Sequence, residues 1–263
     1  MSKKNKLSGK DLFDEYYSTQ YRDRWPILRE ALKENKNSMV SIPGLNEPYY
    51  LDQSSMETAD RLPISEGMAV LDMCAAPGGK TLILAKKLRG KGKLISNDRS
   101  PDRRMRLSKV INASLTDEEK AIIRITGFDS SSWGVYEKDV YDAILLDAPC
   151  SSERHVINDT SHLDIWSPNR PKRLAVTQYA MLSSALIAAK KGGYILYSTC
   201  SINDNENEKI IEKLFKRHSN EVSEIPVDIP YGEKRSHGMI VLPDTSAGRG
   251  PMYLCLLKKK ESD

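Results

Sequence analysis

The sequence predicts a doubly wound α/β fold, in which helices cover both faces of a mostly parallel sheet that ends in an antiparallel hairpin. Two observations lead to this prediction. From residue 62 onward, apolar segments of strand length alternate with helical segments, which is typical of parallel sheets that are covered on both faces. Near the C-terminus, two apolar segments at 238–243 and 250–259 follow one another without a helical pattern between them, so we expect them to pair antiparallel.

The expected elements alternate along the chain. The strands of the parallel part are expected at 68–73, 93–98, 121–127, 141–149 and 192–200. The helices that cover them are expected at 79–89, 102–112, 170–190 and 204–217. A mostly parallel, Rossmann-like sheet with a final antiparallel hairpin is the architecture of S-adenosylmethionine-dependent methyltransferases, which makes these enzymes one candidate class.

Residues 1–61 precede this alternation and are expected to form a helical extension of the main domain, 62–263. Residues 1–10 are expected to be disordered. The next residues predict a helix, because apolar and aromatic side chains recur at helical spacing: Leu12, Phe13, Tyr16 and Tyr17. A second helix is expected from Pro26 to about Leu32, followed by a short strand at 39–42 and a short helix at 53–61. The aromatic residues, with Trp25, are expected to form the seam between the extension and the main domain.

Composition limits the classes of function. The chain has 263 residues, which suits one large domain or one domain with an extension. No apolar run has the length of a membrane span, and the basic N-terminus lacks the apolar stretch of a secretory signal. We therefore expect a cytoplasmic protein without a membrane partner, and a mitochondrial matrix location stays open. The net charge of +4 permits a polyanionic partner without requiring one.

The cysteines do not form the pattern of a metal site. Cys74, Cys150, Cys200 and Cys255 include no C-x-x-C pair, and the four histidines do not cluster with them in the sequence. We therefore expect neither a zinc site nor a disulfide framework, and no other metal. A reducing compartment fits free thiols.

A glycine turn at residues 71–81, LDMCAAPGGKT, ends like the phosphate-binding loop of an ATPase. That loop has the form G-x-x-x-x-G-K-[ST], but the position of its first glycine is occupied by Cys74. The dinucleotide fingerprint G-x-G-x-x-G is absent as well. What remains is a strand that ends at Asp72 and a turn of small residues in which Gly78 and Gly79 enter a helix. Such a turn lets a ligand approach the backbone closely.

Two acidic residues after the next strands indicate that the ligand contains adenosine. Asp98 ends the strand after the glycine turn, 20 residues beyond Gly78, where an acid accepts hydrogen bonds from ribose hydroxyls in nucleoside-binding folds. Asp129 follows the third strand, where it could meet the adenine edge. Alternatively, the glycines only begin a helix and the acids only cap helices, but their ordered succession favours an adenosine pocket.

Cys150 and Cys200 follow two strands that we expect to be neighbours. A parallel crossover usually returns beside its start, at a spacing of about 4.8 Å. Both thiols would then open onto the crevice at the carboxyl ends of the strands, where ligands bind in open α/β sheets. Most free cysteines are small buried hydrophobic residues, but Asp147, three residues before Cys150, favours a functional pair here.

Three motifs, MCAAPGGKT, LLDAPCSS and YSTCS, together resemble the Sun family (RsmB-like) of RNA cytosine-5 methyltransferases over about 62–259. The segments FDEYYSTQYRDRW, NDRSP, PCSSERH and GPMYLCLLKK look most like the short branch with mitochondrial members that act on ribosomal or transfer RNA. Many members end in a GFF-type strand, whereas this chain has Gly250, Pro251, Met252 and Tyr253, an ending that the short branch shares.

The resemblance implies S-adenosyl-L-methionine as cofactor and assigns the site residues. The cofactor would lie on the glycine turn and on the acids that follow the strands: Cys74, Ala75, Ala76, Pro77, Gly78, Gly79, Lys80, Asp98, Asp129 and Asp147. The resemblance assigns Cys200 as the nucleophile, Cys150 to release of the methylated product, and Asp147 to the polar edge of the cytosine. Lys80 is a candidate cation that lowers the pKa of a thiol, although it could instead face solvent.

The chemistry explains why thiols are needed. Carbon 5 of cytosine is a poor nucleophile, and addition of a thiolate to carbon 6 converts the ring to an enamine that can attack a methyl group. The thiol must be partly ionised for this addition. DNA cytosine-5 methyltransferases are a rival class, because Pro149–Cys150 fits their motif, but Thr199–Cys200 favours RNA. In either class the target base must leave its stack.

Several alternatives stay open. Ribosomal RNA is favoured over transfer RNA as substrate, and a non-catalytic RNA-binding ribosome-assembly factor is possible on the same fold. No separate RNA-binding module is visible, so a pre-ribosomal particle or a helper protein could place the RNA, and the chain is expected to be a monomer. His155 could contact the substrate. Two basic clusters, at 86–93 and 99–109, are either RNA contacts or solvated surface.

Overall fold

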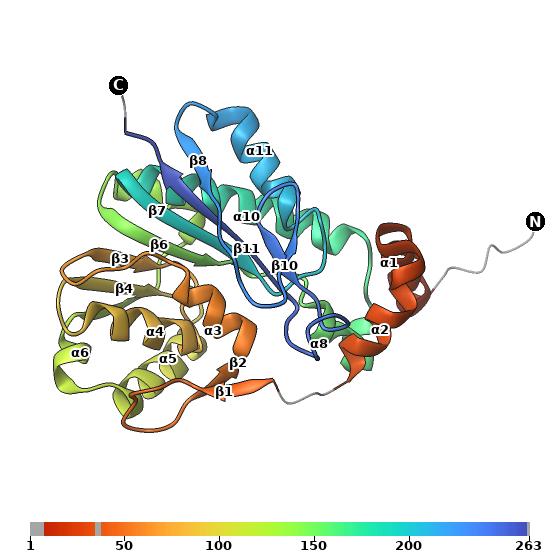
Figure 1. Cartoon of the computed structure of the whole chain (residues 1–263), viewed down its shortest axis with the longest axis horizontal. Coiled ribbons are helices and arrows are strands. Elements are labelled where there is room, and N and C mark those ends of the chain that lie inside the picture. Colours follow the sequence, from red (N-terminus) through yellow and green to blue (C-terminus); the bar gives the residue numbers. More distant parts are fainter. Residues whose placement is uncertain (1–7, 35–37, 262–263) are drawn as a thin grey trace, which may run out of the picture.

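The structure is a computed structural model that describes residues 8–34 and 38–261. Its centre is a sheet in the order β5-β4-β3-β6-β7-β11-β10-β9, with β8 beside β11 (Figure 1). Five neighbouring strands pair in parallel: β5 (Ile123–Thr126), β4 (Lys93–Asn97), β3 (Ala69–Asp72), β6 (Tyr141–Asp147) and β7 (Ala189–Thr199). The doubly wound architecture predicted from the sequence is confirmed.

The C-terminal strands pair antiparallel. β11 (Met252–Lys259) lies between β7 and β10 (Met239–Val241) and is antiparallel to both, so the predicted hairpin is confirmed. Two short strands extend this part of the sheet: β8 (Val222–Ile225) pairs with β11, and β9 (Glu233–Lys234) pairs with β10. β8 and β9 were not predicted.

Alternation along the strands supplies two cores, because successive side chains of a strand point to opposite faces. In β6, Ile144 and Leu146 belong to the core beneath the long helix α10 (Asn169–Ala188), whereas Ala143 and Leu145 belong to the opposite core. The first face also carries α7 (Trp133–Tyr136) and α11 (Glu208–His218). The second face carries α3 (Gln53–Asp60), α4 (Gly79–Leu88), α5 (Pro101–Ser114) and α6 (Asp117–Ala121) (Figure 1).

The N-terminal helices α1 (Gly9–Tyr21) and α2 (Trp25–Lys33), joined by the 3₁₀ turn Arg22–Arg24, belong to the first core. Phe13, Tyr17 and Trp25 are buried, and their rings pack on one another and on Trp166. The predicted aromatic seam is therefore confirmed. An α1 capping box between Ser8 and Asp11 begins the first helix.

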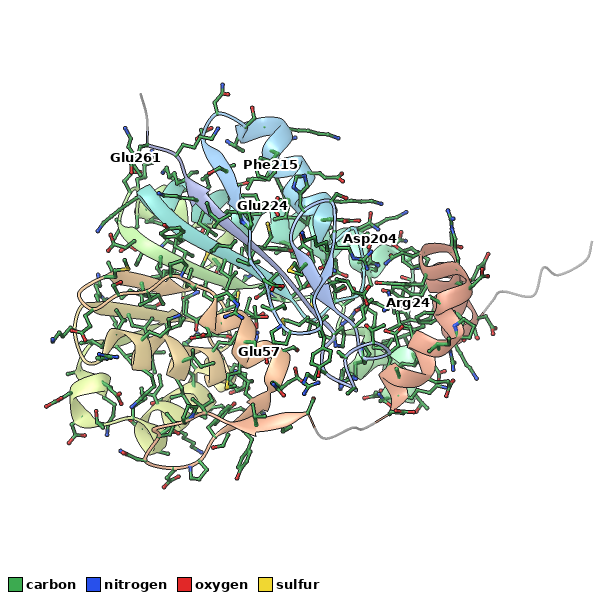
Figure 2. The ribbon with its side chains drawn as sticks, viewed as in Figure 1. Arg24, Glu57, Asp204, Phe215, Glu224 and Glu261 are labelled. Carbon is green, nitrogen blue, oxygen red and sulfur yellow. The ribbon has the colours of Figure 1, made fainter. Side chains whose placement is uncertain are left out.

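Arg24 joins this extension to the C-terminal part of the chain (Figure 2). Its guanidinium lies 2.6 Å from Glu233 and 2.6 Å from Asp244. Fork-shaped guanidinium groups suit two carboxylates at once. The extension is thus fastened by charge as well as by its aromatic core.

Some predicted boundaries were wrong. Disorder was predicted for 1–10: residues 1–7 lie outside the described residues, and Gly9 and Lys10 are helical. The helix predicted from 204 begins at Glu208, because Asp204–Asn207 form a hydrogen-bonded turn instead. The strand predicted at 39–42 is β1 (Met39–Ser41), and its partner β2 (Tyr50–Asp52) was missed. Short helices α8 (Glu153–Asn158) and α9 (Thr160–Asp164) and the 3₁₀ turn Ser130–Ser132 were also missed. Within the described ranges, no helix has the length and apolarity to cross a membrane.

Candidate active site

The glycine turn joins β3 to α4. Gly78 has φ +125°, a conformation that favours glycine, and a Cβ there would meet Val110 Cγ1 at 3.0 Å. A Cβ on Gly79 would meet the Tyr49 ring at 2.8 Å. The fold itself therefore requires both glycines, because the turn packs closely against α5 and against Tyr49. Burial raises the pKa of the Cys74 thiol, which keeps this cysteine of the turn protonated.

Asp72, the last residue of β3, is a buried acid at the start of this turn. Its Oδ2 accepts a hydrogen bond of 2.7 Å from the Thr81 hydroxyl, while Oδ1 has no hydrogen-bond partner among the described residues. Burial raises the pKa of Asp72 to about 7. An acceptor of this kind beside the turn is available to a polar ligand.

Asp98 and Asp129 differ in their surroundings. Asp98 is 4% exposed; its Oδ1 accepts from the Ser100 amide, and its Oδ2 lies 3.3 Å from Arg103. Arg103 also donates to the carbonyl of Ala76, so it ties the end of β4 to the glycine turn. Asp129 is more exposed and caps the following 3₁₀ turn through Ser131, whose hydrogen bonds lower the pKa of Asp129. The capping interpretation therefore applies to Asp129, although a cap does not exclude contact with a ligand.

Asn97, which the sequence analysis did not single out, fixes the ends of β4 and β5. Its amide donates to the carbonyls of Met73 and Phe128, and its oxygen accepts from Thr126 and from the Phe128 amide. The loop that carries Asp129 is thereby held against the glycine turn.

Lys80 points to the end of β6 and not to solvent. Its Nζ lies 2.6 Å from Asp147 Oδ2, and only 10% of its side chain is exposed. The other oxygen of Asp147 accepts a hydrogen bond of 2.8 Å from Ser198 of β7. The alternative in which Lys80 faces solvent is therefore wrong, and this ion pair links α4 with two strands of the sheet.

The two cysteines meet beyond the paired ends of β6 and β7. Cys150 Sγ and Cys200 Sγ are 3.2 Å apart, and the Ser152 hydroxyl lies 3.3 Å from Cys200 Sγ. The hydrogen bond with Cys150, followed by that with Ser152, lowers the pKa of Cys200, and the same contact raises the pKa of Cys150. Of the two thiols, Cys200 is thus the one that ionises more readily. The prediction that β6 and β7 are neighbours is confirmed.

Two buried glutamates hold the cysteine loops, and the sequence analysis missed both. Glu206 accepts from the amide and hydroxyl of Ser151, next to Cys150, and from Gln178. Glu153 accepts from Tyr17 of α1 and from the amide of Ile202. The hydroxyl of Ser201, next to Cys200, lies 3.1 Å from Glu153 and 3.3 Å from Glu206. Burial raises the pKa of Glu206 to about 7 and raises that of Glu153.

A cavity of about 720 Å³ opens beside Cys200. It is lined from three directions, by the N-terminal extension, by α8 and by the start of β11. The lining includes Lys33, Met39, Ser152, His155 and Pro251. His155 thus lines the same cavity as Cys200, and its contact with a substrate stays a prediction.

The basic clusters are partly engaged within the protein. Arg104 donates to the carbonyls of Asp98 and Arg99, Lys86 pairs with Glu119, and Lys87 pairs with Asp60. The Arg104 contacts hold the loop after β4, and the two lysine pairs join the last turn of α4 to α6 and to α3. They provide a structural reason for part of each cluster that needs no RNA.

The chain matches a protein-family model described as 16S rRNA methyltransferase RsmB/F over residues 59–258. Among curated proteins, it is 34% identical to the 5-cytosine rRNA methyltransferase NSUN4 of Bos taurus, over 81% of this chain and 59% of the relative. It is also 34% identical to the ribosomal RNA small subunit methyltransferase F of Shewanella oneidensis, over 76% of this chain and 42% of the relative. The chain thus spans 42–59% of the length of these relatives.

Solved structures share the fold. A methyltransferase homolog from Pyrococcus horikoshii has a TM-score of 0.76 at 21% identity, with 95% of each chain covered. NSun6 from the same organism has a TM-score of 0.68 at 24% identity, over 82% of this chain and 54% of that chain. The fold likeness and the family match agree with the motifs at the strand ends. The chain belongs to the RsmB/F methyltransferase family.

Proposed function

We propose that this protein is an RNA cytosine-5 methyltransferase that methylates carbon 5 of a cytosine in ribosomal RNA. One observation carries the proposal: two thiols whose sulfur atoms are 3.2 Å apart lie at the carboxyl ends of β6 and β7, where the Lys80–Asp147 ion pair also lies. A packing role for two cysteines would not require a largely buried lysine–aspartate pair at the same strand ends. Membership of the RsmB/F family supports the same reaction.

The cofactor of this proposal is S-adenosyl-L-methionine, and the residues at the glycine turn fit it. Asp98 offers a buried carboxylate for ribose hydroxyls, and Asp129 lies on the loop after β5. Asp72 lies at the start of the turn, and its Oδ1 has no hydrogen-bond partner in the part of the chain that the structure describes. When bound, S-adenosylmethionine supplies an electrophilic methyl group. The absent first glycine, at Cys74, argues against ATP.

Cys200 acts as the nucleophile in this mechanism. Its thiolate forms a bond with carbon 6 of cytosine, and the electron pair of the 5,6 double bond makes carbon 5 nucleophilic. After methylation, a base takes the proton from carbon 5, the double bond re-forms, and the bond between carbon 6 and sulfur breaks with its electron pair returning to Cys200. Cys150, whose sulfur lies 3.2 Å from that of Cys200, assists this release.

Asp147 and Lys80 orient the base. Asp147 is fixed by Ser198 and by Lys80, so its carboxylate can accept a hydrogen bond from the amino edge of cytosine without rearrangement. The hydrogen bonds from Cys150 and Ser152 are the main causes of the low pKa of Cys200, and the charge of Lys80 lowers it further. Removal of Lys80 would therefore affect both the base and the thiolate.

The N-terminal extension, residues 1–61, has the role of placing RNA. Lys33 and Met39 of the extension line the cavity that contains Cys200, so an RNA strand that reaches the thiol would pass them. The protein acts as a monomer, with placement aided by a pre-ribosomal particle or a helper protein. The rRNA names of the relatives favour ribosomal over transfer RNA. The proposed location is the cytoplasm, and the mitochondrial matrix stays open.

Transfer of a radiolabelled methyl group from S-adenosylmethionine tests the proposal. The purified protein should label ribosomal RNA from cells that lack it, and nuclease digestion should release the label as 5-methylcytidine. Cys200→Ala should abolish labelling, whereas Cys255→Ala, which changes a buried cysteine of β11 outside the site, should still label RNA. A wild-type protein that binds such RNA without labelling it would favour the assembly-factor alternative.

A further inference from the structure

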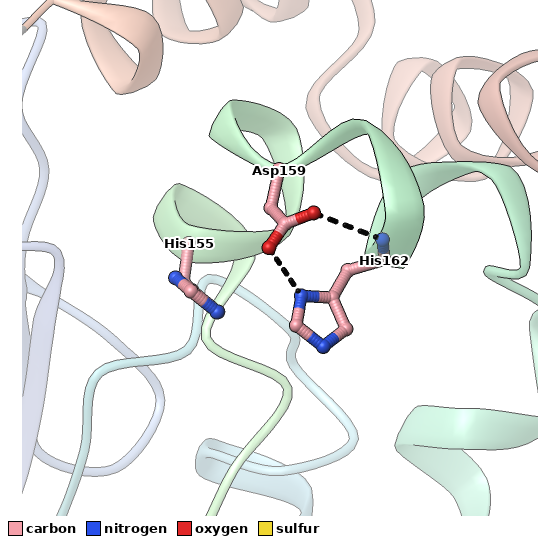
Figure 3. Close-up of side chains that lie close together, drawn as sticks. All are labelled: His155, Asp159 and His162. Carbon is pink, nitrogen blue, oxygen red and sulfur yellow. Dashed lines mark hydrogen bonds and ion pairs between the residues drawn. The ribbon is translucent and has the colours of Figure 1, made fainter.

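A group of potential metal ligands lies beside the cysteine site. His155, Asp159 and His162 come from the α8–α9 segment, and their ligand atoms all lie within 4.8 Å of one another (Figure 3). His155 also lines the cavity that contains Cys200. We propose that these three side chains bind a divalent transition-metal ion of the zinc type at the rim of that cavity.

The donor set matches this class of metal. Imidazole nitrogen suits zinc, copper and nickel, whereas magnesium and calcium prefer oxygen ligands alone. Two imidazoles and one carboxylate provide three of the four ligands of a tetrahedral zinc ion, and the fourth position stays open to water or to a phosphate oxygen. With metal–ligand distances of about 2.0–2.2 Å, the ligand atoms of such a site lie about 3.4 Å apart. The ligand atoms now lie within 4.8 Å of one another, so binding of the ion would draw them closer by at most about 1.4 Å. His155 is exposed.

Asp159 is already held in position for this task. Its Oδ1 accepts from the amides of Ser161 and His162, which makes Asp159 the N-cap of α9, and its Oδ2 lies 3.0 Å from His162 Nδ1 (Figure 3). Capping therefore uses one carboxylate oxygen, and the other points to the histidines.

An ordinary pair of one histidine and one carboxylate does not need a second histidine beside it. His218 and Glu221 form such a pair at 2.8 Å with the same three-residue spacing, and no third ligand joins them among the described residues. At α8–α9, the ring of His155 lies 5.0 Å from the ring of His162. We expected no metal from the sequence because the histidines do not cluster with the cysteines. The spacing His-x₃-Asp-x₂-His was a signal that could have indicated this site.

Calorimetry with zinc ions alone tests the proposal, and it does not depend on methyltransferase activity. The full chain should carry Cys150→Ala and Cys200→Ala, since neighbouring thiols also bind zinc. We expect one saturable site in this background. His155→Ala and His162→Ala should each weaken it by about tenfold or more, because loss of even an outer partner of a ligand changes metal affinity by roughly 10–100-fold. Asp159→Asn should also weaken binding, although asparagine keeps the N-cap.

His218→Ala is the matched control and should leave the affinity unchanged, and a thermal unfolding curve for each variant should show that it is folded. Three results would overturn the proposal. The first is no saturable zinc binding to the Cys150→Ala/Cys200→Ala protein. The second is an unchanged zinc affinity in that protein when it also carries His155→Ala and His162→Ala. The third is an equal loss of affinity in His218→Ala.

Discussion

We expect that contact with Cys150 lowers the pKa of Cys200, and this effect can be measured directly. The two sulfur atoms are 3.2 Å apart, and their hydrogen bond is the main cause of the lowered pKa of Cys200. A hydrogen bond to a charged group contributes about 1.5–3 kcal/mol, and a thiol is a weak donor, so we take the lower end. Because about 1.4 kcal/mol corresponds to a tenfold change in an equilibrium constant, Cys150→Ala should raise the pKa of Cys200 and slow its alkylation below that pKa by about tenfold.

The assay is the rate of alkylation by iodoacetamide as a function of pH, with mass spectrometry to locate the label. The thiolate is the reactive form, so the alkylation profile of Cys200 should shift to higher pH in Cys150→Ala. Ser152→Ala should shift it less, because Ser152 is the weaker of the two donors that lower this pKa. Cys74→Ala is the control and should change nothing. An unchanged profile in Cys150→Ala would refute the reasoning.

With RNA present, the same variants show whether Cys200 attacks the base, as in the RNA-type mechanism, or Cys150 attacks it, as in the DNA-type mechanism. Cys150→Ala should still attack carbon 6 and methylate, then stall as a protein–RNA band that survives denaturing electrophoresis. Cys200→Ala and the double variant should give no band, because both lack the nucleophile. The DNA-type mechanism predicts the reverse, with the band lost in Cys150→Ala and kept in Cys200→Ala.

Other predictions concern the cofactor, the RNA and the buried glutamates. Asp98→Ala should weaken S-adenosylmethionine binding by about 10–100-fold, the loss of about 1.5–3 kcal/mol, and more than Asp129→Ala; calorimetry measures both, and tight ATP binding instead would contradict the assignment. Lys33→Ala should weaken RNA binding and reduce its dependence on salt, because each phosphate contact releases counterions, whereas Lys10→Ala, an exposed change on α1, should not. Burial raises the pKa of Glu206 from 4.5 to about 7; the folded state then binds the proton more tightly than the unfolded state, so stability falls as pH rises between these values. Glu206→Gln should reduce this pH dependence of the free energy of unfolding, which urea unfolding curves at several pH values measure. An unchanged pH dependence would show that Glu206 is not protonated.

The residues at strand ends could be predicted because parallel strands bring their carboxyl ends to one edge. This rule alone places the glycine turn, Asp147, Cys150 and Cys200 together, and their contacts agree with it. It could not assign the partner of Lys80, because the direction of a long side chain depends on what lies opposite. It also could not separate Asp98 from Asp129: both follow strands, but only Asp98 is buried beside the turn.

The buried hydrogen bonds that hold the cysteine loops could not be predicted, because they join segments that are far apart in the sequence. Glu153 lies 136 residues from its partner Tyr17, and Glu206 lies 55 residues from Ser151. Each glutamate stands in a polar stretch that reads as an ordinary exposed loop. β8 was not predicted for a related reason. Its sequence VSEI has little apolar character, and among the described strands it pairs only with β11.

These buried glutamates explain how the chain holds its two cysteines in fixed positions. A nucleophile must be held to a fraction of an ångström, and residues whose own positions are locked by packing and hydrogen bonds achieve this. Ser151 and Ser201 adjoin the two cysteines, and both hydroxyls bind the carboxylates of Glu206 or Glu153. Glu153 also binds Tyr17 of α1. The N-terminal extension is therefore connected to the nucleophile through one buried network, so a change in α1 can alter the chemistry of Cys200 without contact with RNA or cofactor.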